Sequence, residues 1–243
     1  MEIKGSSRVR LGALHLHTDY SHDGRLSLKE LRDLFLVRGL SFLILTEHAE
    51  DFDQAKARRF LTECRQLSTD NFLLIPGFEV VREGQHILEI GNGALRILAH
   101  PHRGRFKVSP ELAAALHGIE IWNGHYDGKW APRASSWQLW RRLRRQHPQL
   151  LALAGLDFHD QRQSNGPLLE VAAEELTAEA ILESLRAGQF IIKSWLRLTS
   201  LADASWLKRL GLGMLSDISL LILWLGRLAG APPALKKLVR KFI

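Results

Sequence analysis

The stretch Leu11-Gly12-Ala13-Leu14-His15-Leu16-His17-Thr18 places two histidines at the end of a strand-length apolar run. Side chains two positions apart leave an extended chain on the same face, so His15 and His17 should point together while the leucines between them pack the other way. Asp157-Phe158-His159 repeats this spacing after the apolar run Leu150 to Gly155. Brought together, the two strands predict a mixed nitrogen and oxygen site, which suits Zn²⁺, Mn²⁺ or Fe²⁺ better than Mg²⁺ or Ca²⁺.

Further histidines and carboxylates recur where an apolar run gives way to a loop. They are Asp23, Thr46-Glu47-His48, Pro76-Gly77-Phe78-Glu79, His86 and Ala99-His100-Pro101-His102. Metal clusters are commonly built at one end of a barrel from residues at strand ends, so these side chains should converge. Glu79, which follows Pro-Gly at the end of its strand, could bridge two ions. With no set of thiolates nearby, a closed structural zinc site is not expected.

Strand-like and helix-like segments alternate through most of the chain. Strands are expected over residues 11–18, 42–46, 72–81, 86–90, 94–99, 118–122, 150–155, 168–172 and 190–193, with a break at Pro76-Gly77. Helices are expected over about 27–37, 51–67, 133–145 and 177–187, and from Ser109 onward. Ser27-Leu28-Lys29-Glu30 is a capping box, and Pro110 suits a first helical position. Repeated alternation of this kind implies a parallel sheet, either open or closed into a barrel.

Several short motifs then follow one another in a characteristic order. They are His-x-His-Thr (15–18), Ser-x-Asp-Gly (21–24), Thr-x-His (46–48), Pro-Gly-x-Glu (76–79), a His opening an Ile-Leu strand (86–88), Ala-His-Pro (99–101), Gly-Ile-Glu-Ile (118–121) and Gly-x-Asp-x-His (155–159). Over about residues 10–198 the chain resembles the PHP (polymerase and histidinol phosphatase) superfamily of metal-dependent phosphoesterases. The resemblance implies an α/β fold, a distorted seven-stranded TIM-like β/α barrel with metals at the carboxyl ends of the strands.

The same resemblance implies nine metal ligands and two to three divalent ions. His15, His17, Glu79 and Asp157 would hold one ion, Glu79, His86 and His100 a second, and Asp23, His48 and His159 a third. The family usually has Asp where this chain has Glu47. Because that residue is expected beside the ligands and not among them, the change bears on the orientation of His48.

The expected chemistry is hydrolysis of a phosphoester by water activated between two ions. Asp157 is expected to serve in catalysis as well as in metal binding. His102 is a candidate to protonate the leaving oxygen, and Arg103 is a candidate to clamp a phosphate, with Arg105 as a second choice. The default reading of Arg103 and Arg105 is that both are ordinary arginines of a surface loop.

Charge distribution favours a small substrate. The net charge is +7, but residues 199–243 carry seven Lys and Arg against two Asp, which leaves +2 for residues 1–198. We therefore expect a small phosphomonoester or a short phosphodiester, and a long nucleic acid is less favoured. One alternative is a nuclease acting on nucleic-acid ends, aided by the arginines of residues 133–145. The other is a metal-binding PHP module without turnover.

The C-terminal extension, residues 199–243, differs from the preceding PHP-type domain, residues 1–198. Its apolar residues recur at helical spacing among basic ones, which predicts amphipathic helix. The helix could pack on the body, join a second subunit in a homo-oligomer, or lie peripherally on an anionic membrane. A spanning helix is disfavoured because Asp217 lies near the middle of the apolar stretch.

Cysteine content and the N-terminal residues bear on localisation. Cys64 is the only cysteine and excludes an intrachain disulfide, which favours a reducing compartment. The first residues contain no apolar run typical of a secretory signal. We therefore expect a cytoplasmic protein, with peripheral membrane association as one alternative for the C-terminal extension.

Overall fold

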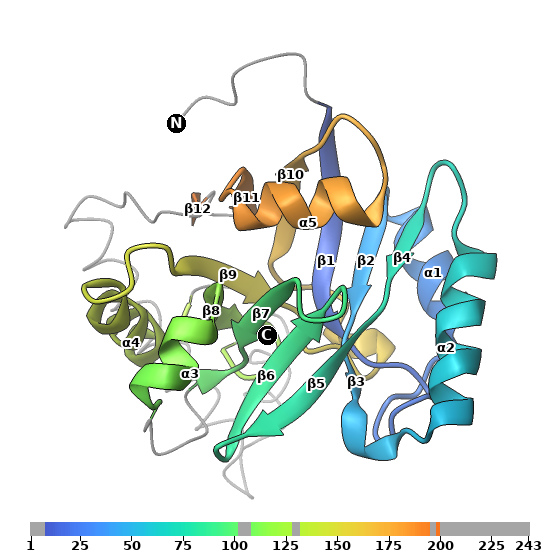
Figure 1. The fold of residues 1–243 in the computed structure, drawn as a ribbon. Coiled ribbons are helices and arrows are strands. Elements are labelled where there is room, and N and C mark those ends of the chain that lie inside the picture. The colour runs from blue at the N-terminus through green and yellow to red at the C-terminus, as the bar shows by residue number, and fades with distance from the viewer. Residues whose placement is uncertain (1–7, 102–107, 128–131, 195–197, 200–243) are drawn as a thin grey trace, which may run out of the picture.

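The computed structural model describes residues 8–101, 108–127, 132–194 and 198–199, which form a mixed α/β fold of two six-stranded sheets with helices on their flanks (Figure 1). In spatial order the first sheet contains β12 (Leu198–Thr199), β11 (Phe190–Lys193), β10 (Leu168–Ala172), β1 (Val9–Leu16), β2 (Phe42–Leu45) and β4 (Leu73–Ile75). The second contains β3 (Glu47–His48), β5 (Gly77–Arg82), β6 (Gln85–Ile90), β7 (Leu95–Leu98), β8 (Gly118–Asn123) and β9 (Leu151–Gly155). The α-helices are α1 (Leu28–Val37), α2 (Gln54–Leu67), α3 (Pro110–Ala115), α4 (Ala134–Arg144) and α5 (Ala178–Arg186).

Strand pairing is mixed, so the parallel sheet expected from the alternation is found only in part. Strands β1, β2 and β4 are parallel, as are β7, β8 and β9. In contrast, β5, β6 and β7 pair antiparallel, and β10 is antiparallel to both β1 and β11. The turns at residues 83–84 and 91–93 explain part of this, because all five of their residues have positive φ and form tight reversals. A parallel crossover needs a far longer connection.

The described strands form two sheets, and no closed seven-stranded barrel is found among them. The chain passes from the first sheet to the second at Thr46, between β2 and β3, and again at Pro76, between β4 and β5. At another place, residues just after β9 bond to the end of β1. The Leu156 N–H donates to the Leu14 carbonyl at 2.8 Å, and the His17 N–H donates to the Phe158 carbonyl at 2.9 Å. The sheets therefore meet at the end that carries the candidate residues.

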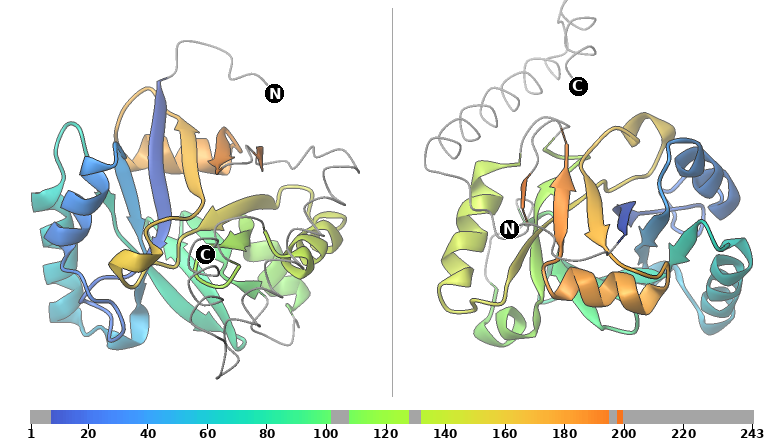
Figure 2. Two further views of the ribbon diagram at one scale, coloured as in Figure 1. Left: turned by 180° about the vertical axis from the view of Figure 1, so that it is seen from behind. Right: turned by 90° about the horizontal axis from the view of Figure 1, so that it is seen from above.

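Two apolar cores fix this arrangement. Along β2 the side chains alternate, so that Phe42 and Ile44 join a core shared by both sheets, while Leu43 and Leu45 pack with α1 and α2. Cys64 of α2 is buried in the second core, as a simple packing residue. Figure 2 shows α1 and α2 on one flank and α4 on the opposite flank. Because side chains fill the space between the sheets, polar chemistry is confined to the strand ends.

The local helix signals are confirmed in detail. Ser27 caps α1, and the reciprocal bonds of the capping box with Glu30 are both present. Ser109 caps α3, with Pro110 as its first residue. In the described ranges, no helix has the length and apolar character required to cross a membrane. The predicted amphipathic extension, residues 199–243, lies outside the described residues except for Thr199.

Candidate metal centre

The candidate ligands are delivered to one end of the two sheets. Most come from the end of a strand or the loop that follows it: His15, His17 and Asp23 from β1, His48 from β3, His100 from β7, and Asp157 and His159 from β9. Glu79 is the third residue of β5, directly after the break at Pro76. His86 instead lies near the start of β6. Because β6 runs antiparallel to β5, with Val81 opposite His86, it is still close to Glu79.

The His15 to His17 segment is a bulged strand end and not a regular pleat. The pairing of β1 with β2 shifts register between Leu14 and Leu16, and His15 has a φ of +68°. Both histidine rings are fully buried, and their centroids are 5.2 Å apart. The expectation that they face one site is therefore confirmed, although the bulge, and not simple alternation, produces it.

Glu79 lies at the centre, and its two carboxylate oxygens face different histidines. Oε1 is 2.6 Å from His86 Nδ1 and 3.0 Å from His100 Nε2. Oε2 is 3.4 Å from the Nε2 atoms of both His15 and His17. A carboxylate placed between two sets of imidazoles in this way has the geometry needed to bridge two cations.

Three groups of side chains lie close enough to share an ion, with ligand atoms within 4.8 Å of one another in each. They are His17, Asp23, His48 and His159; His15, Glu79 and His100; and His15, His17 and Asp157. The first group is the most open, since Asp23 is 38% exposed. Asp23 Oδ2 is 3.1 Å from His159 Nε2 and 3.3 Å from His48 Nε2. These groups contain eight of the nine predicted ligands and could hold divalent ions. His86 belongs to none of the three groups, although its Nδ1 lies 2.6 Å from Glu79 Oε1.

The ionisation states of the carboxylates and of His17 are those expected of metal ligands. Burial alone would raise the pKa of Glu79, but the charge of His15 and hydrogen bonds from His100 hold that pKa far below its usual range. Burial likewise opposes ionisation of Asp157, yet the histidines around it, His15 first, lower its pKa to about 2. Burial lowers the pKa of His17 to about 4. Ionised carboxylates and neutral imidazoles are the forms that bind metals.

His15 behaves differently. Burial alone would lower the pKa of its imidazole, but the neighbouring Glu120, Asp157 and Glu79 carboxylates raise it well above the ordinary value. In the absence of a cation, a protonated His15 would partly offset this concentration of negative charge. A metal would have to displace that proton, so binding at His15 would release it.

His17 provides a direct test of whether a metal fits. Its ring is fully buried, and neither imidazole nitrogen makes a hydrogen bond within the described part of the chain. Buried polar atoms nearly always have a partner, because an unsatisfied one costs about 1–3 kcal/mol. His17 Nε2 lies 3.4 Å from Glu79 Oε2 and 3.7 Å from Asp157 Oδ1. A cation among these three atoms would satisfy a nitrogen that the protein leaves unpaired.

Glu47 supports the loop that carries these ligands. Its carboxylate is fully buried and accepts hydrogen bonds from the Thr18 N–H and hydroxyl and from the Ser21 hydroxyl. Ser21 Oγ in turn accepts the His48 N–H at 2.9 Å. Glu47 is therefore linked to the backbone of His48 through the Ser21 hydroxyl.

Two residues support the candidate ligands, and the sequence did not predict this supporting role for either of them. Glu120, in β8, accepts hydrogen bonds from His15 Nδ1 at 2.9 Å and from the His100 N–H at 2.7 Å. Asn123 donates to Asp157 Oδ2 at 3.2 Å. A sequence signal was present, since Glu120 is the only charged residue in the strand Gly118 to Asn123. A lone glutamate in an apolar strand must find buried partners.

The structure does not describe every predicted residue. His102, Arg103 and Arg105, the candidates for proton donation and phosphate binding, lie outside the described residues.

In the loop after β8, the His125 ring is 5.6 Å from that of His159, and the Tyr126 ring is 5.5 Å from that of His100. Gln163 bonds to His125 Nδ1 and accepts the His159 N–H through its other amide atom. This loop therefore borders the candidate metal centre.

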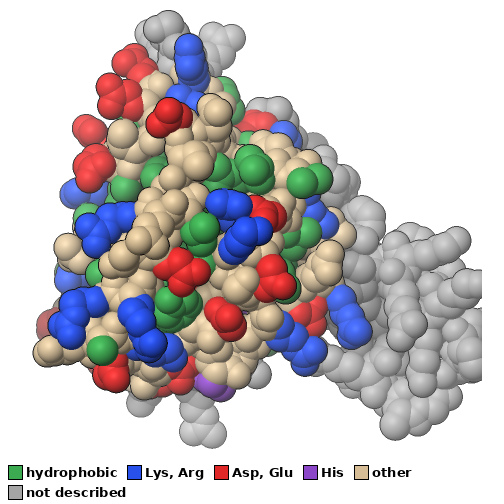
Figure 3. Space-filling model, turned by 90° about the vertical axis from the view of Figure 1, so that its right-hand side faces the viewer, with side chains coloured by type: hydrophobic (Ala, Val, Ile, Leu, Met, Phe, Trp, Pro, Cys, Tyr) green, Lys and Arg blue, Asp and Glu red, His purple; other side chains and the backbone are tan. Residues whose placement is uncertain are grey.

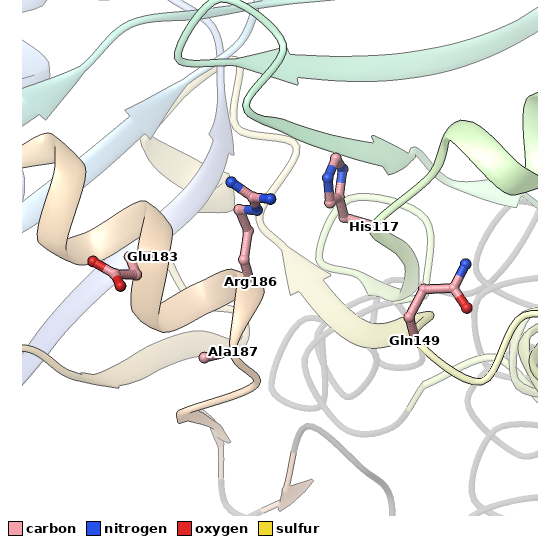
Figure 4. Close-up of a pocket in the computed structure, with 5 residues that line it drawn as sticks. All are labelled: His117, Gln149, Glu183, Arg186 and Ala187. Atoms are coloured by element: carbon pink, nitrogen blue, oxygen red, sulfur yellow. The ribbon is translucent and has the colours of Figure 1, made fainter.

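A separate hollow of about 550 Å³ lies away from these residues (Figure 4). His117, Gln149, Glu183, Arg186 and Ala187 line it. His117 and Gln149 precede β8 and β9, whereas the candidate ligands Asp157 and His159 follow β9 at its other end. The hollow is thus at the opposite end of the sheet from the candidate metal centre, and none of the nine candidate ligands lines it.

Comparisons with known proteins bear on the fold. Neither the protein-family models nor the curated proteins contain a match to this sequence. Among solved structures, the chain is similar to a two-domain protein from Bacteroides vulgatus ATCC 8482 that contains a predicted PHP-like metal-dependent phosphoesterase. The TM-score is 0.58 at 18% sequence identity, over 85% of this chain and 70% of that one.

A second similar structure, from Bifidobacterium adolescentis ATCC 15703, is provisionally named a metal-dependent phosphoesterase. It has 15% identity and a TM-score of 0.47, over 74% of this chain and 97% of that chain. At such low identity the likeness to the first structure concerns the fold alone, and the second is too weak to carry an argument. The described part of the chain therefore has a PHP-like fold.

Proposed function

We propose that this protein is a PHP-type metal-dependent phosphoesterase that hydrolyses a small phosphomonoester or a short phosphodiester. Two to three divalent ions, Zn²⁺, Mn²⁺ or Fe²⁺, would be held by the nine residues His15, His17, Asp23, His48, Glu79, His86, His100, Asp157 and His159. The observation that carries the proposal is the position of Glu79, whose two oxygens face separate sets of histidines. That arrangement suits a multinuclear site better than a single structural ion.

The side chains of the centre have distinct parts in this reaction. When bound, divalent ions supply Lewis acidity toward water and phosphoryl oxygens. Glu79 and Asp157 hold negative charge where those ions would bind, and Asp157 Oδ1, on the side of His15 and His17, can orient a water. His102 as proton donor and Arg103 as phosphate clamp stay predictions.

The charge pattern of one face of the molecule supports a small substrate. On the face formed by α1 and α2, basic and acidic side chains are interspersed (Figure 3). Lys29 and Arg32 pair with Asp33 there. Tight binding of a long nucleic acid requires an extended basic surface and weakens steeply with salt. We therefore expect turnover to change little with ionic strength, and a steep salt dependence on an oligonucleotide would favour the nuclease alternative.

The test combines metal analysis with substrate turnover. Purified protein is stripped with a chelator, reconstituted separately with Zn²⁺, Mn²⁺ and Fe²⁺, and assayed on aryl phosphates, aryl phosphodiesters and short oligonucleotides. We expect turnover with at least one metal and its loss in Asp157→Asn, which keeps a side chain tolerant of the φ of +51° at this position.

The matched control is Glu89→Gln. Glu89 is in β6 opposite Phe78 and pairs with Arg82, away from the ligands, so this variant should keep wild-type activity. Full metal loading with no turnover on the whole panel would contradict the enzymatic proposal and favour a metal-binding module. Turnover that persists in Asp157→Asn would contradict the proposed site.

The remaining proposals concern partners and location. We propose a PHP-type domain over residues 1–198 and a C-terminal extension over residues 199–243 that mediates peripheral membrane or homo-oligomer contact in the cytoplasm. Vesicle sedimentation and size-exclusion chromatography of the full chain, compared with a chain ending at residue 205, test this extension. A role in partner contact predicts that truncation changes one of the two readouts while turnover is kept.

A further inference from the structure

Backbone strain is concentrated at the candidate metal centre. Three of its ligands have positive φ: His15 at +68°, His100 at +23° and Asp157 at +51°. The other non-glycine residues with positive φ in the described ranges, Glu83 and Asn92, lie in tight turns. A left-handed conformation costs a non-glycine residue about 1–2 kcal/mol, so it persists only where surrounding contacts enforce it.

Glu120 contacts two of these three residues directly. Its carboxylate is fully buried, and Oε1 accepts a hydrogen bond from His15 Nδ1 at 2.9 Å. Oε2 accepts the backbone N–H of His100 at 2.7 Å and the side-chain amide of Asn123 at 2.9 Å. One carboxylate thus fixes the ring of His15 and the backbone of His100.

Asn123 extends the contact to the third strained residue. Its amide donates to Asp157 Oδ2 at 3.2 Å as well as to Glu120. The other carboxylate oxygen, Asp157 Oδ1, then faces His15 Nε2 at 3.3 Å. Asn123 Oδ1 accepts the N–H groups of His125 and Tyr126, which fixes the orientation of the whole amide. Each ligand with a strained backbone is therefore bonded to one of the two residues: His15 and His100 to Glu120, and Asp157 to Asn123.

Glu120 is tightly packed against Gly155 of the neighbouring strand β9. A side-chain carbon at Gly155 would come within 2.1 Å of Glu120 Oε1 and 2.7 Å of His15 Cβ. The absence of a side chain at Gly155 is thus what allows β9 to approach the contact between Glu120 and His15. Since a bond from Nδ1 to a carboxylate sets the tautomer of an imidazole, it leaves His15 Nε2 as the nitrogen that faces Glu79 and Asp157.

We propose that Glu120 and Asn123 act together as positioning residues that hold His15, His100 and Asp157 in place and thereby set the metal affinity of the centre. This inference rests on the proposed metal-dependent function. The pair binds neither ion nor substrate itself. Its effect is to align donor atoms before a metal arrives, so that binding need not organise three strained residues.

The experiment measures metal affinity directly. Stripped wild type and Glu120→Gln are titrated with Zn²⁺ and with Co²⁺ against a chromogenic chelator, and the visible absorption of bound Co²⁺ reports ligand geometry. The amide of Gln keeps the shape of Glu but cannot accept at both ends, so either His15 or His100 and Asn123 loses its partner. We expect affinity for the tightest ion to fall about 10- to 100-fold, with an altered Co²⁺ spectrum.

The matched control is Glu170→Gln. Glu170 is also a largely buried strand glutamate, but it pairs with Lys193 at 3.1 Å in the first sheet. A general loss of stability would affect both variants, whereas only Glu120→Gln should change the Co²⁺ spectrum. Equal affinities and spectra in wild type, Glu120→Gln and Glu170→Gln would overturn the inference.

A second variant decides the matter if Glu120→Gln does not fold. Asn123→Ser keeps an oxygen near the N–H groups of His125 and Tyr126 but is too short to reach Asp157, so it should also lower affinity. If the pair acts as a unit, the double variant should lose less than the sum of the single losses. Full additivity would overturn the joint role. A turnover assay tests the enzymatic proposal separately. If wild-type protein binds metal but hydrolyses no substrate, the enzymatic proposal is refuted and the inference about Glu120 and Asn123 is not.

Discussion

His17 is a fully buried imidazole whose two nitrogens find no hydrogen bond in the described part of the chain. The backbone around it is well bonded, since the His17 N–H donates to Phe158. The structure therefore enforces the position of a side chain whose polar atoms are a cost without a cation. A residue of this kind lowers the stability of the metal-free protein and in return provides a ligand for a metal.

This trade predicts the behaviour of His17→Leu. The substitution removes the unsatisfied nitrogens, so the metal-free protein should gain about 1 kcal/mol in free energy of unfolding. It should also lose the stabilisation that added metal gives to wild type. Urea unfolding with chelator and with metal measures both effects. His147→Leu, at a partly exposed position beyond α4, is the control and should change neither. Lower metal-free stability in His17→Leu would contradict the argument.

His117, in the hollow at the opposite end of the sheet, predicts a pH effect independent of the metal centre. Burial, helped by the charges of Arg186 and Arg96, lowers its pKa from about 6.5, and its Nδ1 accepts the Arg96 N–H. The unfolded state then binds more protons just below pH 6.5, so this contribution to stability is present above that pH and is lost as the pH falls.

The comparison uses His117→Gln, which cannot titrate. In chelator-treated protein, wild type should lose stability relative to this variant between pH 8 and pH 5.5, while other titrating groups cancel in the difference. Urea unfolding at the two pH values gives that difference. A wild-type advantage that stays constant with pH would show that His117 has the same proton affinity in both states.

At the residue scale, sequence reasoning found the chemistry-bearing side chains but not their supports. His15 and His17 could be predicted to share a face because spacing alone implies it. Their bulge could not be predicted, because it depends on the register with β2, a contact made by a distant part of the chain. The role of Glu120 depends likewise on His15, which lies 105 positions away.

Among the elements, the loop after β1 has the tightest constraints. Gly24 follows Asp23, and a side-chain carbon at Gly24 would lie 2.0 Å from the Thr18 carbonyl oxygen. Ser21 in the same loop bonds to Glu47 and to the His48 N–H. The loop therefore fixes the positions of Asp23 and His48 together. Both residues belong to the most open group of candidate ligands, with His17 and His159.

Gly24→Ala should displace this loop, because the clash is with backbone and cannot be relieved by rotating a side chain. We expect loss of about one equivalent of bound metal, measured by elemental analysis, with the more buried groups still loaded. The control is Gly39→Ala, which strains a φ of +77° after α1 but meets no atom. It should lower stability and keep full metal content. Unchanged stoichiometry in Gly24→Ala would contradict this role for the loop.

The elements themselves were largely predictable, and their pairing was not. The strand expected over residues 72–81 is broken by Pro76-Gly77 as predicted, into β4 and β5. The sequence does not reveal that this break moves the chain from one sheet to the other. Nor does the strand pattern of residues 168–172 tell that β10 runs antiparallel to β1, because pairing direction depends on long-range contacts.

For the whole molecule, the main feature is a centre shared by two sheets. His15 and His17 come from β1 in the first sheet, whereas Glu79 and Asp157 come from β5 and the end of β9 in the second. Backbone bonds between the sheets are few here and include those of Leu156 and Phe158 to β1. Ions in the centre would therefore connect the two sheets, which otherwise contact each other mainly through the shared apolar core.

Metal removal should consequently destabilise the entire described fold. At a metal concentration 100-fold above Kd, one site adds about 2.7 kcal/mol, which corresponds to roughly 5–10 °C in Tm for a domain of this size. Calorimetry with and without chelator measures the shift. Hydrogen exchange should also accelerate in both β1 and β9 when metal is absent. A change confined to one sheet would contradict a connecting role.

The unequal exposure of the ligands has a consequence for metal exchange kinetics. His15, His17 and Asp157 are almost fully enclosed, while Asp23 is 38% exposed and the His86 side chain 41% exposed. An ion held by the enclosed residues would leave slowly and retain the element that was acquired first. Ions next to Asp23 or His86 would equilibrate with the surrounding supply. A single molecule could thus carry different elements at its inner and outer positions, according to when each was bound.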